Sequence, residues 1–429
     1  MGALAKSESG AAALLARHPA PPAGSAWAEA TREAARSRLA AMGAPGRRDE
    51  YWRYTDPTPL TDEAAEAEAL PPEPVAVFDE VDALRLVFVD GVFSPELSDD
   101  PSLAGIEIQP LGDALASDIH WAKSVFGALE AAGQDPVPRP LAALNTATAA
   151  EGFAIRATGA AARPVHFRYL HERPDSDAVL RHVIKVESGA SLTILENGPA
   201  AARFNKAMEI DVADGGAFNH VRAQGRDHDR LAVTHMFARL GTESAFKSFT
   251  LTVNGRLTRN EMVIEFAGDD ASGHVAGACI GEGAFHHDDT VFVTHDAVNC
   301  ESRQVFKKVL KAGAKGVFQG KILVKEGAQK TDGYQISQGL LLDDDCDFSA
   351  KPELEIYADD VACSHGSTCG AVDETALFYL RSRGVPESAA KDMLVIAFVD
   401  EAVREIEDDA IAEIIRQRIA EWLARRAKG

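Results

Sequence analysis

The chain has 429 residues, of which 46% are hydrophobic, and it carries a formal net charge of −22. This length and apolar content suit two or three structural units with a substantial core and exclude an intrinsically disordered chain. The negative charge argues against non-specific binding to nucleic acid or anionic lipid, because both rely on clustered Lys and Arg. No apolar run approaches the roughly 20 residues that span a bilayer, and the N-terminus lacks the apolar core of a signal peptide, so we expect a cytoplasmic protein.

The N-terminal part of the chain is predicted to be helical. A stretch rich in Ala, Arg and Glu from Ser25 to Met42 indicates a helix that ends before Gly43. The aromatic residues Tyr51, Trp52 and Tyr54 follow, and their composition favours an anchor that packs this helix onto the rest of the chain over a ligand platform. Acidic, Pro-rich sequence at 61–74 is typical of a linker. We therefore assign residues 1–80 to an N-terminal helical region with a linker.

The middle of the chain has the pattern of β-strands. Short β-branched runs bounded by Gly, Asn or Asp follow one another, and almost none has helical periodicity. These runs are LRLVFV, HVIKVE, LTILEN, KAMEIDV, SFTLTV, EMVIEF, TVFVTHD and GKILVKE. An Ala recurs beside a small residue at positions 190, 217, 245, 284 and 314, with separations of 27, 28, 39 and 30 residues. Such spacing favours the stacked coils of a β-helix over residues 81–370, with a β-sandwich as the alternative.

Residues 371–429 are predicted to form a C-terminal helical domain. One helix spans Asp373 to Arg383 and ends at Gly384. In the two helices after it, the expected buried faces are Ala389, Met393, Ile396, Ala397 and Val403, and then Ile411, Ile415, Ile419 and Trp422. The acidic residues Glu401, Glu405, Glu407, Asp408 and Asp409 are predicted to form a solvated surface rather than a docking site.

The segment Lys351 to Gly370 carries the strongest candidate for chemistry. Cys363, His365 and Cys369 lie within seven residues, with Glu353, Glu355, Asp359 and Asp360 just upstream. Thiolate and imidazole suit metal, sulfur or redox chemistry. Strand alternation would place Cys363 and His365 on one face, but two ligands do not complete a tetrahedral metal site. A buried structural cysteine with a hydrogen-bonded histidine remains an equal alternative.

The other candidates are weaker. His286 and His287 precede two aspartates, and adjacent histidines in a strand face opposite ways, so we expect an exposed polar turn rather than a metal site. The five cysteines, with Cys279, Cys300 and Cys346 completing the set, form no disulfide framework, as suits a reducing compartment. There is no phosphate loop, dinucleotide-binding fingerprint, H-E-x-x-H or G-x-S-x-G motif. We therefore expect no nucleotide hydrolysis by this chain.

Three segments resemble the shared core of the SufB/SufD family of iron–sulfur cluster assembly proteins. They are GKILVKEGAQKTDGYQISQGLLL (Gly320 to Leu342), KPELEIYADDVACSHGSTCG (Lys351 to Gly370) and DETALFYLRSRGV (Asp373 to Val385). The segments EYWRYTD, LVFVDGVFSPELS and ALNTATAAEGFAI resemble the family more loosely and extend the likeness over nearly the whole chain. The CSHG sequence and the absence of cysteine from the first 278 residues favour the SufD branch over the SufB branch.

The resemblance implies a mainly β fold, in which a right-handed parallel β-helix lies between N-terminal and C-terminal helical domains. It implies a non-catalytic scaffold that pairs with a SufB-like subunit through the β-helix and binds a SufC-like ATPase through its C-terminal helices. For the contact with the ATPase we single out Leu377, Tyr379, Leu380 and Arg383. The alternatives are a stand-alone metal-binding β-helix protein and a β-helix carbohydrate-active enzyme. The 7% aromatic content argues against the enzyme.

In that family the histidine of the CSHG motif lies at the SufB and SufD interface and is implicated in cluster formation. Here it is His365, with Cys363 beside it, and a partner cysteine or carboxylate would complete the site. The resemblance thus implies no tightly bound cofactor in the isolated chain, which could be a homodimer, and iron or a nascent cluster held transiently in the complex. Cys369 departs from the family pattern. The cluster type and the point of sulfur entry do not follow from the sequence.

Overall fold

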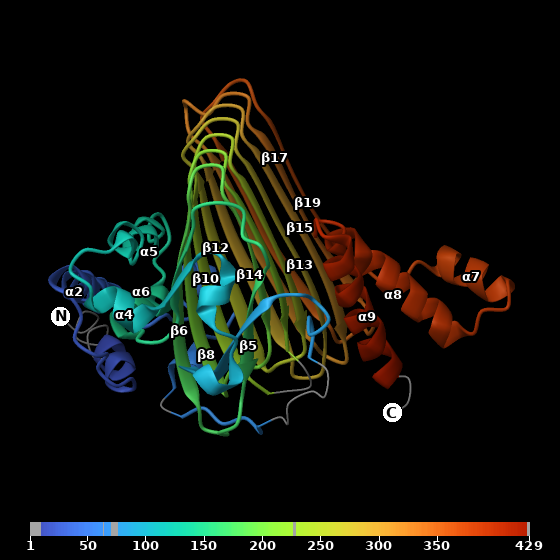
Figure 1. The fold of residues 1–429 in the computed structure, drawn as a ribbon. Coiled ribbons are helices and arrows are strands. Elements are labelled where there is room, and N and C mark those ends of the chain that lie inside the picture. Colours follow the sequence, from blue (N-terminus) through green and yellow to red (C-terminus); the bar gives the residue numbers. More distant parts are fainter. Residues whose placement is uncertain (1–9, 63, 70–75, 226–228, 427–429) are drawn as a thin grey trace.

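The chain forms a β-solenoid of about 7 turns with helices on two sides (Figure 1). The computed structural model describes residues 10–62, 64–69, 76–225 and 229–426. The predicted fold class is confirmed, and the β-sandwich alternative is wrong because strands of successive coils pair in parallel. Part of the predicted linker lies outside the described residues. The division into domains at residues 80 and 370 stays a prediction.

Each coil of the solenoid contributes one strand to each of two facing sheets. Sheet A runs in the order β19-β17-β15-β13-β11-β9-β7-β5-β1-β2, and sheet B in the order β18-β16-β14-β12-β10-β8-β6-β4-β3. Sheet A comprises β1 (Leu84–Val89), β2 (Val92–Phe93), β5 (Val165–Leu170), β7 (Ser191–Asn197), β9 (Ala217–Gln224), β11 (Ala245–Val253), β13 (Ser272–Glu282), β15 (Glu301–Lys311), β17 (Asp332–Leu341) and β19 (Ala362–Gly370). Sheet B comprises β3 (Glu107–Pro110), β4 (Phe153–Ala157), β6 (Asp177–Val186), β8 (Arg203–Val212), β10 (Leu231–Leu240), β12 (Leu257–Phe266), β14 (His286–His295), β16 (Lys315–Val324) and β18 (Asp347–Ile356).

The alanine residues recur about once per coil, first at or next to strands of sheet A and then next to strands of sheet B. Ala217 and Ala245 are register partners in β9 and β11, and Ser272 continues this row in β13. The separation of 39 residues leads instead to Ala284, just before β14, so it passes from sheet A to sheet B. The repeat was therefore predicted correctly as a coil, but its last two members belong to the other sheet.

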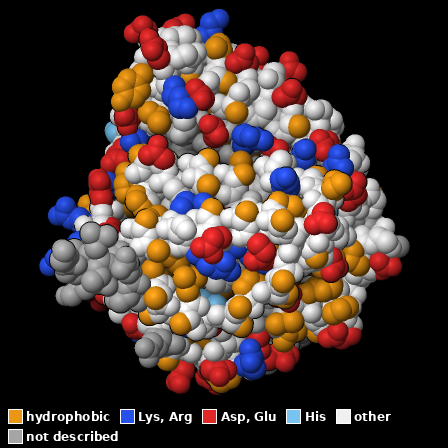
Figure 2. All heavy atoms as spheres, turned by 90° about the vertical axis from the view of Figure 1, so that its left-hand side faces the viewer, with side chains coloured by type: hydrophobic (Ala, Val, Ile, Leu, Met, Phe, Trp, Pro, Cys, Tyr) orange, Lys and Arg blue, Asp and Glu red, His pale blue; other side chains and the backbone are white. Residues whose placement is uncertain are grey.

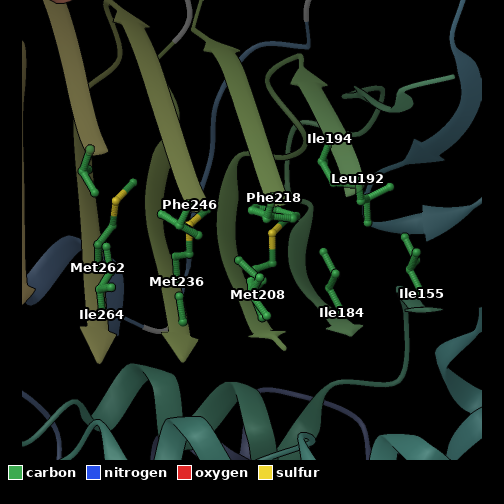
Figure 3. Packing of buried hydrophobic residues seen from close by; sticks show 14 of the residues in the cluster. Ile155, Ile184, Leu192, Ile194, Met208, Phe218, Met236, Phe246, Met262 and Ile264 are labelled. Atoms are coloured by element: carbon green, nitrogen blue, oxygen red, sulfur yellow. The ribbon is translucent and has the colours of Figure 1, made fainter. Parts of the chain in front are cut away.

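Identical side chains stack in rows inside the solenoid. Met208, Met236 and Met262 are register partners on β8, β10 and β12, and Phe218 pairs in the same way with Phe246 on the facing sheet. Figure 3 shows these rows facing each other across the interior. All five residues are at most 6% exposed. Because the strands stack in parallel and in register, apolar side chains of successive coils contact one another and form one continuous core.

The N-terminal helices cover the outer face of sheet B (Figure 1). They comprise α2 (Ala26–Met42), α3 (Thr58–Thr61), α4 (Leu111–Ala116), α5 (Ala128–Ala132) and α6 (Pro140–Thr148), with 3₁₀ turns η1 (Glu50–Trp52), η2 (Pro95–Leu97), η3 (Pro101–Ala104) and η4 (Trp121–Ser124). The guanidinium of Arg259 on β12 lies 4.1 Å from the ring centroid of Trp52, and Tyr51 packs edge-on against Phe292 of β14. The predicted aromatic anchor is confirmed for Tyr51 and Trp52, whereas Tyr54 is 38% exposed. On the face in Figure 2, acidic and basic side chains are interspersed.

The C-terminal helices lie on the opposite side of the solenoid (Figure 1). They are α7 (Glu374–Ser382), α8 (Glu387–Val403) and α9 (Asp409–Arg426). The predicted apolar face of α9 is confirmed, because Ile411, Ile415, Ile419 and Trp422 are all at most 3% exposed. In α8 the buried face is Ala390, Val395, Val399, Ala402 and Val403. The prediction is confirmed for Val403 but wrong for Met393, which is 50% exposed, and for Ala397, which is also exposed, because a neighbouring face of α8 packs against sheet A and α9. None of the described helices is long and apolar enough to cross a membrane.

Some acidic residues at the end of α8 and just after it form ion pairs with side chains on the outer face of sheet A. Nε of Arg303 on β15 lies 2.7 Å from Glu405, whose other carboxylate oxygen is 3.5 Å from His274 on β13. Lys307 pairs with Glu401. The predicted solvated surface is therefore wrong for Glu405, whose side chain is 15% exposed. The cause is a row of basic side chains on the outer face of sheet A, which the sequence pattern of α8 alone does not reveal.

We expect acid to loosen α8 from sheet A through Glu405. Burial raises the pKa of this carboxyl, but hydrogen bonds from His274 and Arg303 outweigh it and hold the pKa below the ordinary 4.5. A lowered pKa contributes stability that is present above pH 4.5 and is lost as the pH falls through the lowered value. The protection of α8 amides against hydrogen exchange, measured relative to unstructured amides at the same pH, should therefore fall below pH 4.5. In Glu405→Gln exchange should be fast already at neutral pH, and an unchanged profile would contradict this role.

Candidate functional site

The candidate residues Cys363 and His365 lie on the last strand of the solenoid. Within the described sheets, β19 pairs only with β17, and β18 pairs only with β16. We call the surface formed by β18 and β19 the open end. A terminal strand presents unpaired backbone N–H and C=O groups that can pair with another chain. The open end is therefore a surface that suits pairing with another β-structure, and the candidate residues lie on it.

Cys363 faces the interior of the last coil. It pairs in register with Gly333 on β17, and a Cβ added to Gly333 would lie 3.1 Å from its Sγ atom. It packs at the edge of a small cluster that includes Ile322 and Val324 of β16. Burial raises the pKa of the Cys363 thiol despite an opposing hydrogen bond with the backbone of Gly333. The thiol is thus protonated at neutral pH, and a nearby cation would be needed to favour the thiolate.

His365 lies two residues further along β19 and is exposed. Because side chains of a strand alternate, its side chain leaves the strand on the same face as that of Cys363. Its register partner on β17 is Gln335. Among the described residues, none forms a hydrogen bond with the imidazole of His365. The ring is therefore accessible to a ligand that approaches the open end.

The carboxylates near Cys363 and His365 in the sequence either pair with other side chains or lie exposed in a turn. Glu353 accepts a hydrogen bond of 2.6 Å from the hydroxyl of Tyr51 and pairs with Lys351 at 3.0 Å, and Glu355 pairs with Lys321 at 2.5 Å. Asp359 and Asp360 are exposed in the turn before β19. Within the described part of the chain, no group of three or more His, Cys, Asp and Glu side chains is arranged to hold a metal ion. Cys363 and His365 are thus two side chains of the kinds that bind metal, fewer than the four of a tetrahedral site.

Cys369 does not join this pair. It lies on β19 opposite Gly339, six residues after Cys363, which corresponds to about 20 Å along an extended strand. Its side chain is exposed, and partial burial raises the pKa of its thiol. One metal ion cannot be bound by both cysteines of this strand.

The prediction of an exposed turn at His286 and His287 is wrong. Both residues begin strand β14 and point to opposite faces, as the alternation argument requires. His286 Nε2 lies 2.9 Å from Thr55 Oγ1 on the outer face, whereas His287 is 1% exposed in the interior. Lys308 donates to His287 at 2.8 Å and to Asp289 at 2.6 Å. Polar residues at the start of the strand form a buried network here, which a sequence pattern does not distinguish from a turn.

The residues proposed for a partner contact on α7 differ in exposure. Leu377 is 5% exposed and packs toward α8, and Tyr379 is 55% exposed with the guanidinium of Arg383 at 4.2 Å from its ring. Leu380 is half-buried. Sequence reasoning missed Phe378, which is 74% exposed. Its position between Leu377 and Tyr379, two of the residues singled out for the partner contact, could have indicated an exposed aromatic pair.

Sequence comparisons find relatives that cover most of the chain. Residues 169–398 match the family model described as the SufBD core domain of the SUF system for iron–sulfur cluster assembly. The chain is 27% identical over 405 residues to the iron–sulfur cluster assembly protein SufD of Escherichia coli, which covers 90% of this chain and 91% of the relative. It is 26% identical to a SufBD family protein of Synechocystis, covering 91% and 90%, and 24% identical to the chloroplastic protein ABCI7 of Arabidopsis thaliana, covering 91% and 86%.

The matched region runs from the end of β5 into α8 and so includes most coils of the solenoid, the open end and α7. The relative from Escherichia coli matches over almost its whole length. The chain belongs to the SufBD family of iron–sulfur cluster assembly proteins and is of the SufD type.

Proposed function

We propose that this protein is a non-catalytic scaffold subunit of a cytoplasmic Suf complex. In this proposal the open end pairs with a SufB-like subunit, the C-terminal helices bind a SufC-like ATPase, and the ATPase activity resides in that partner. Family membership supports a role in iron–sulfur cluster assembly. The partners and the role in iron acquisition are the parts that we propose.

One observation carries the proposal: an incomplete ligand pair lies on a strand whose outer edge is unpaired. Cys363 and His365 supply a thiol and an imidazole on β19, and four ligands are usual for a tetrahedral site. A second β-structure that pairs with the open end would bring its own side chains to the same place. Neutral imidazole suits iron. We infer that His365 accepts iron or holds a nascent cluster as cargo, with the remaining ligands from the partner.

A homodimer of the isolated chain would use the same surface, since a second copy presents the same edge. The direct experiment is co-expression with SufB-like and SufC-like subunits, followed by native mass measurement. A complex that contains all three chains supports the scaffold proposal. If this chain purifies alone from such cells, with the partners present and folded, the proposed pairing is wrong.

The surface for the ATPase is proposed on α7 and the adjoining part of α8. Phe378 and Tyr379 are exposed on α7, and Met393 is exposed on α8. In Figure 1, α7 projects away from the solenoid, and it packs against α8. Exposed aromatics of this kind are typical anchors of protein interfaces. A partner that moves on ATP binding could pull on α8 and thereby act on sheet A and the open end.

We expect the double substitution of Phe378 and Tyr379 by Ser to weaken binding of the SufC-like ATPase by roughly 30-fold or more, the loss that follows truncation of interface anchors. The fold should be unaffected because both side chains are exposed. Isothermal titration with the purified ATPase measures this. The matched control is Ile119→Ser, which removes a side chain that is 96% exposed on the opposite side of the molecule. Equal affinities for wild type and the double variant would exclude this surface.

A further inference from the structure

A buried glutamine lies directly beneath the open end without a hydrogen-bond partner. Gln335 of β17 is 0% exposed. Neither Oε1 nor Nε2 of its amide forms a hydrogen bond with any described residue. An amide can donate two hydrogen bonds and accept two, and buried polar groups are almost always paired. The amide of Gln335 can therefore form a hydrogen bond with a polar group that moves next to it.

The neighbours of Gln335 determine where that group can be. On sheet A its register partner toward the open end is His365. Across the interior, a Cβ added to Gly320 of β16 would lie 2.3 Å from its Oε1 atom, so glycine at position 320 leaves the space that this amide fills. Gly320 in turn pairs in register with Pro352 on β18. The amide thus lies between the sheets, one strand spacing below His365 and Pro352.

Packing alone gives no reason for an amide at this position. The small cluster beside it consists of Ile322, Val324, Ala328 and Ala358, with Cys363 at its edge. A methionine would fill the same length of side chain without a buried polar group. An unpaired amide costs free energy in the folded state. Gln304, one coil deeper, also has an unpaired amide, but it is Gln335 that is the register partner of His365 on β19, and this place gives its amide a hydrogen-bonding partner at the open end.

We propose that Gln335 is a positioning residue for His365. Its Oε1 atom accepts a hydrogen bond from one ring N–H of His365 once that ring turns inward over the open end. This fixes the tautomer and directs the lone pair of the other ring nitrogen toward the partner subunit. Histidines that bind metal generally donate their second N–H in this way. The inference rests on the proposed role of His365 as a ligand for the cargo iron.

The test uses Gln335→Met in the complex with the SufB-like and SufC-like subunits. With ¹⁵N-histidine in this chain only, the ring signals of His365 are assigned by their loss in His365→Gln. We expect wild type to show one tautomer and Gln335→Met to show a mixture of two. We also expect Co²⁺, used as a spectroscopic probe for Fe²⁺, to bind roughly 10- to 100-fold more weakly at the site that depends on His365. Thermal stability should be equal or higher.

The matched control is Gln304→Met. Gln304 is the register partner of Gln335 one coil deeper, is also 0% exposed, and also has an unpaired amide. It is not adjacent to β19, so its replacement should leave the tautomer of His365 and Co²⁺ binding unchanged. Gln335→Glu, which keeps an acceptor, should restore a single tautomer. A single unchanged tautomer in Gln335→Met, or equal effects of both methionine variants, would overturn the positioning role.

The role of Gln335 and the role of His365 can fail independently of each other. If His365→Ala builds clusters at the normal rate, the role of His365 is wrong, whatever the state of its tautomer. If His365→Ala is impaired and Gln335→Met shows the wild-type tautomer and Co²⁺ affinity, His365 keeps its role and the inference about Gln335 is wrong.

Discussion

His365→Ala should leave the complex with the SufB-like and SufC-like subunits intact while cluster build-up falls roughly tenfold or more. The expected fall follows from the loss of an imidazole at the proposed shared metal site, since replacing even a residue that only hydrogen-bonds to a metal ligand lowers metal affinity 10- to 100-fold. His365 is exposed and forms no hydrogen bond within the described chain, so its removal should not disturb β19. Cluster formation is measured by iron and sulfide content and by visible absorbance of the purified complex.

The matched control for this variant is Ser364→Ala. Ser364 is also exposed on β19, but its side chain leaves the strand on the opposite face. It should assemble and build clusters like wild type. Normal cluster formation in His365→Ala would refute the role assigned to the histidine. Loss of the partner subunits from His365→Ala would instead show that this residue acts in assembly.

Arg181→Met should destabilise the folded chain by about 3–5 kcal/mol, the usual cost of breaking a fully buried ion pair. Arg181 on β6 and Glu209 on β8 are both fully buried, with Nη2 of Arg181 2.6 Å from Oε2 of Glu209. The same carboxylate accepts hydrogen bonds from the backbone N–H groups of Gly127 and Glu130, next to α5. Burial raises the pKa of Glu209, and Arg181 opposes this. Without Arg181, the carboxylate that joins the helices to the solenoid would be buried without a cation.

Urea-induced unfolding followed by circular dichroism measures this loss. Adding Glu209→Gln to Arg181→Met should recover part of the stability, because it removes the buried negative charge while the amide oxygen still accepts from one of the two backbone N–H groups, of Gly127 or of Glu130. The exposed pair of Lys325 and Asp296, with side chains 45% and 43% exposed, provides the control. Lys325→Met should change the free energy of unfolding by less than about 1 kcal/mol. Similar losses in Arg181→Met and Lys325→Met would contradict the importance of the buried pair.

The solenoid could be predicted from the sequence because apolar β-branched runs recur once per strand. Each predicted run overlaps a strand: EMVIEF lies within β12, whereas HVIKVE, TVFVTHD and GKILVKE extend one or two residues past the ends of β6, β14 and β16. Strands with buried polar residues were missed or shortened. β15 carries Gln304, Lys307 and Lys308, all at most 1% exposed. Asp289 on the facing sheet pairs with Lys308 and Glu401 on α8 pairs with Lys307, whereas the amide of Gln304 is unpaired. Such compensation depends on tertiary contacts, which alternation within one strand does not encode.

The candidate site was predictable in part. The spacing of Cys363 and His365 was sufficient to place both on one face of a strand and to show that the ligand set is incomplete. The sequence could not show that β19 is the last strand of sheet A, because that depends on which strands pair. The sequence also did not point to Gln335, because only the packed interior shows that its amide is unpaired.

The most direct test of a site shared between subunits is the iron and sulfide content of the protein alone and in its complex. After anaerobic reconstitution with Fe²⁺ and sulfide, the isolated chain should retain neither on gel filtration. The complex with SufB-like and SufC-like subunits should retain both, and should lose them when it contains His365→Ala. An isolated chain that retains a stoichiometric cluster, or a complex that retains it without His365, would contradict this account.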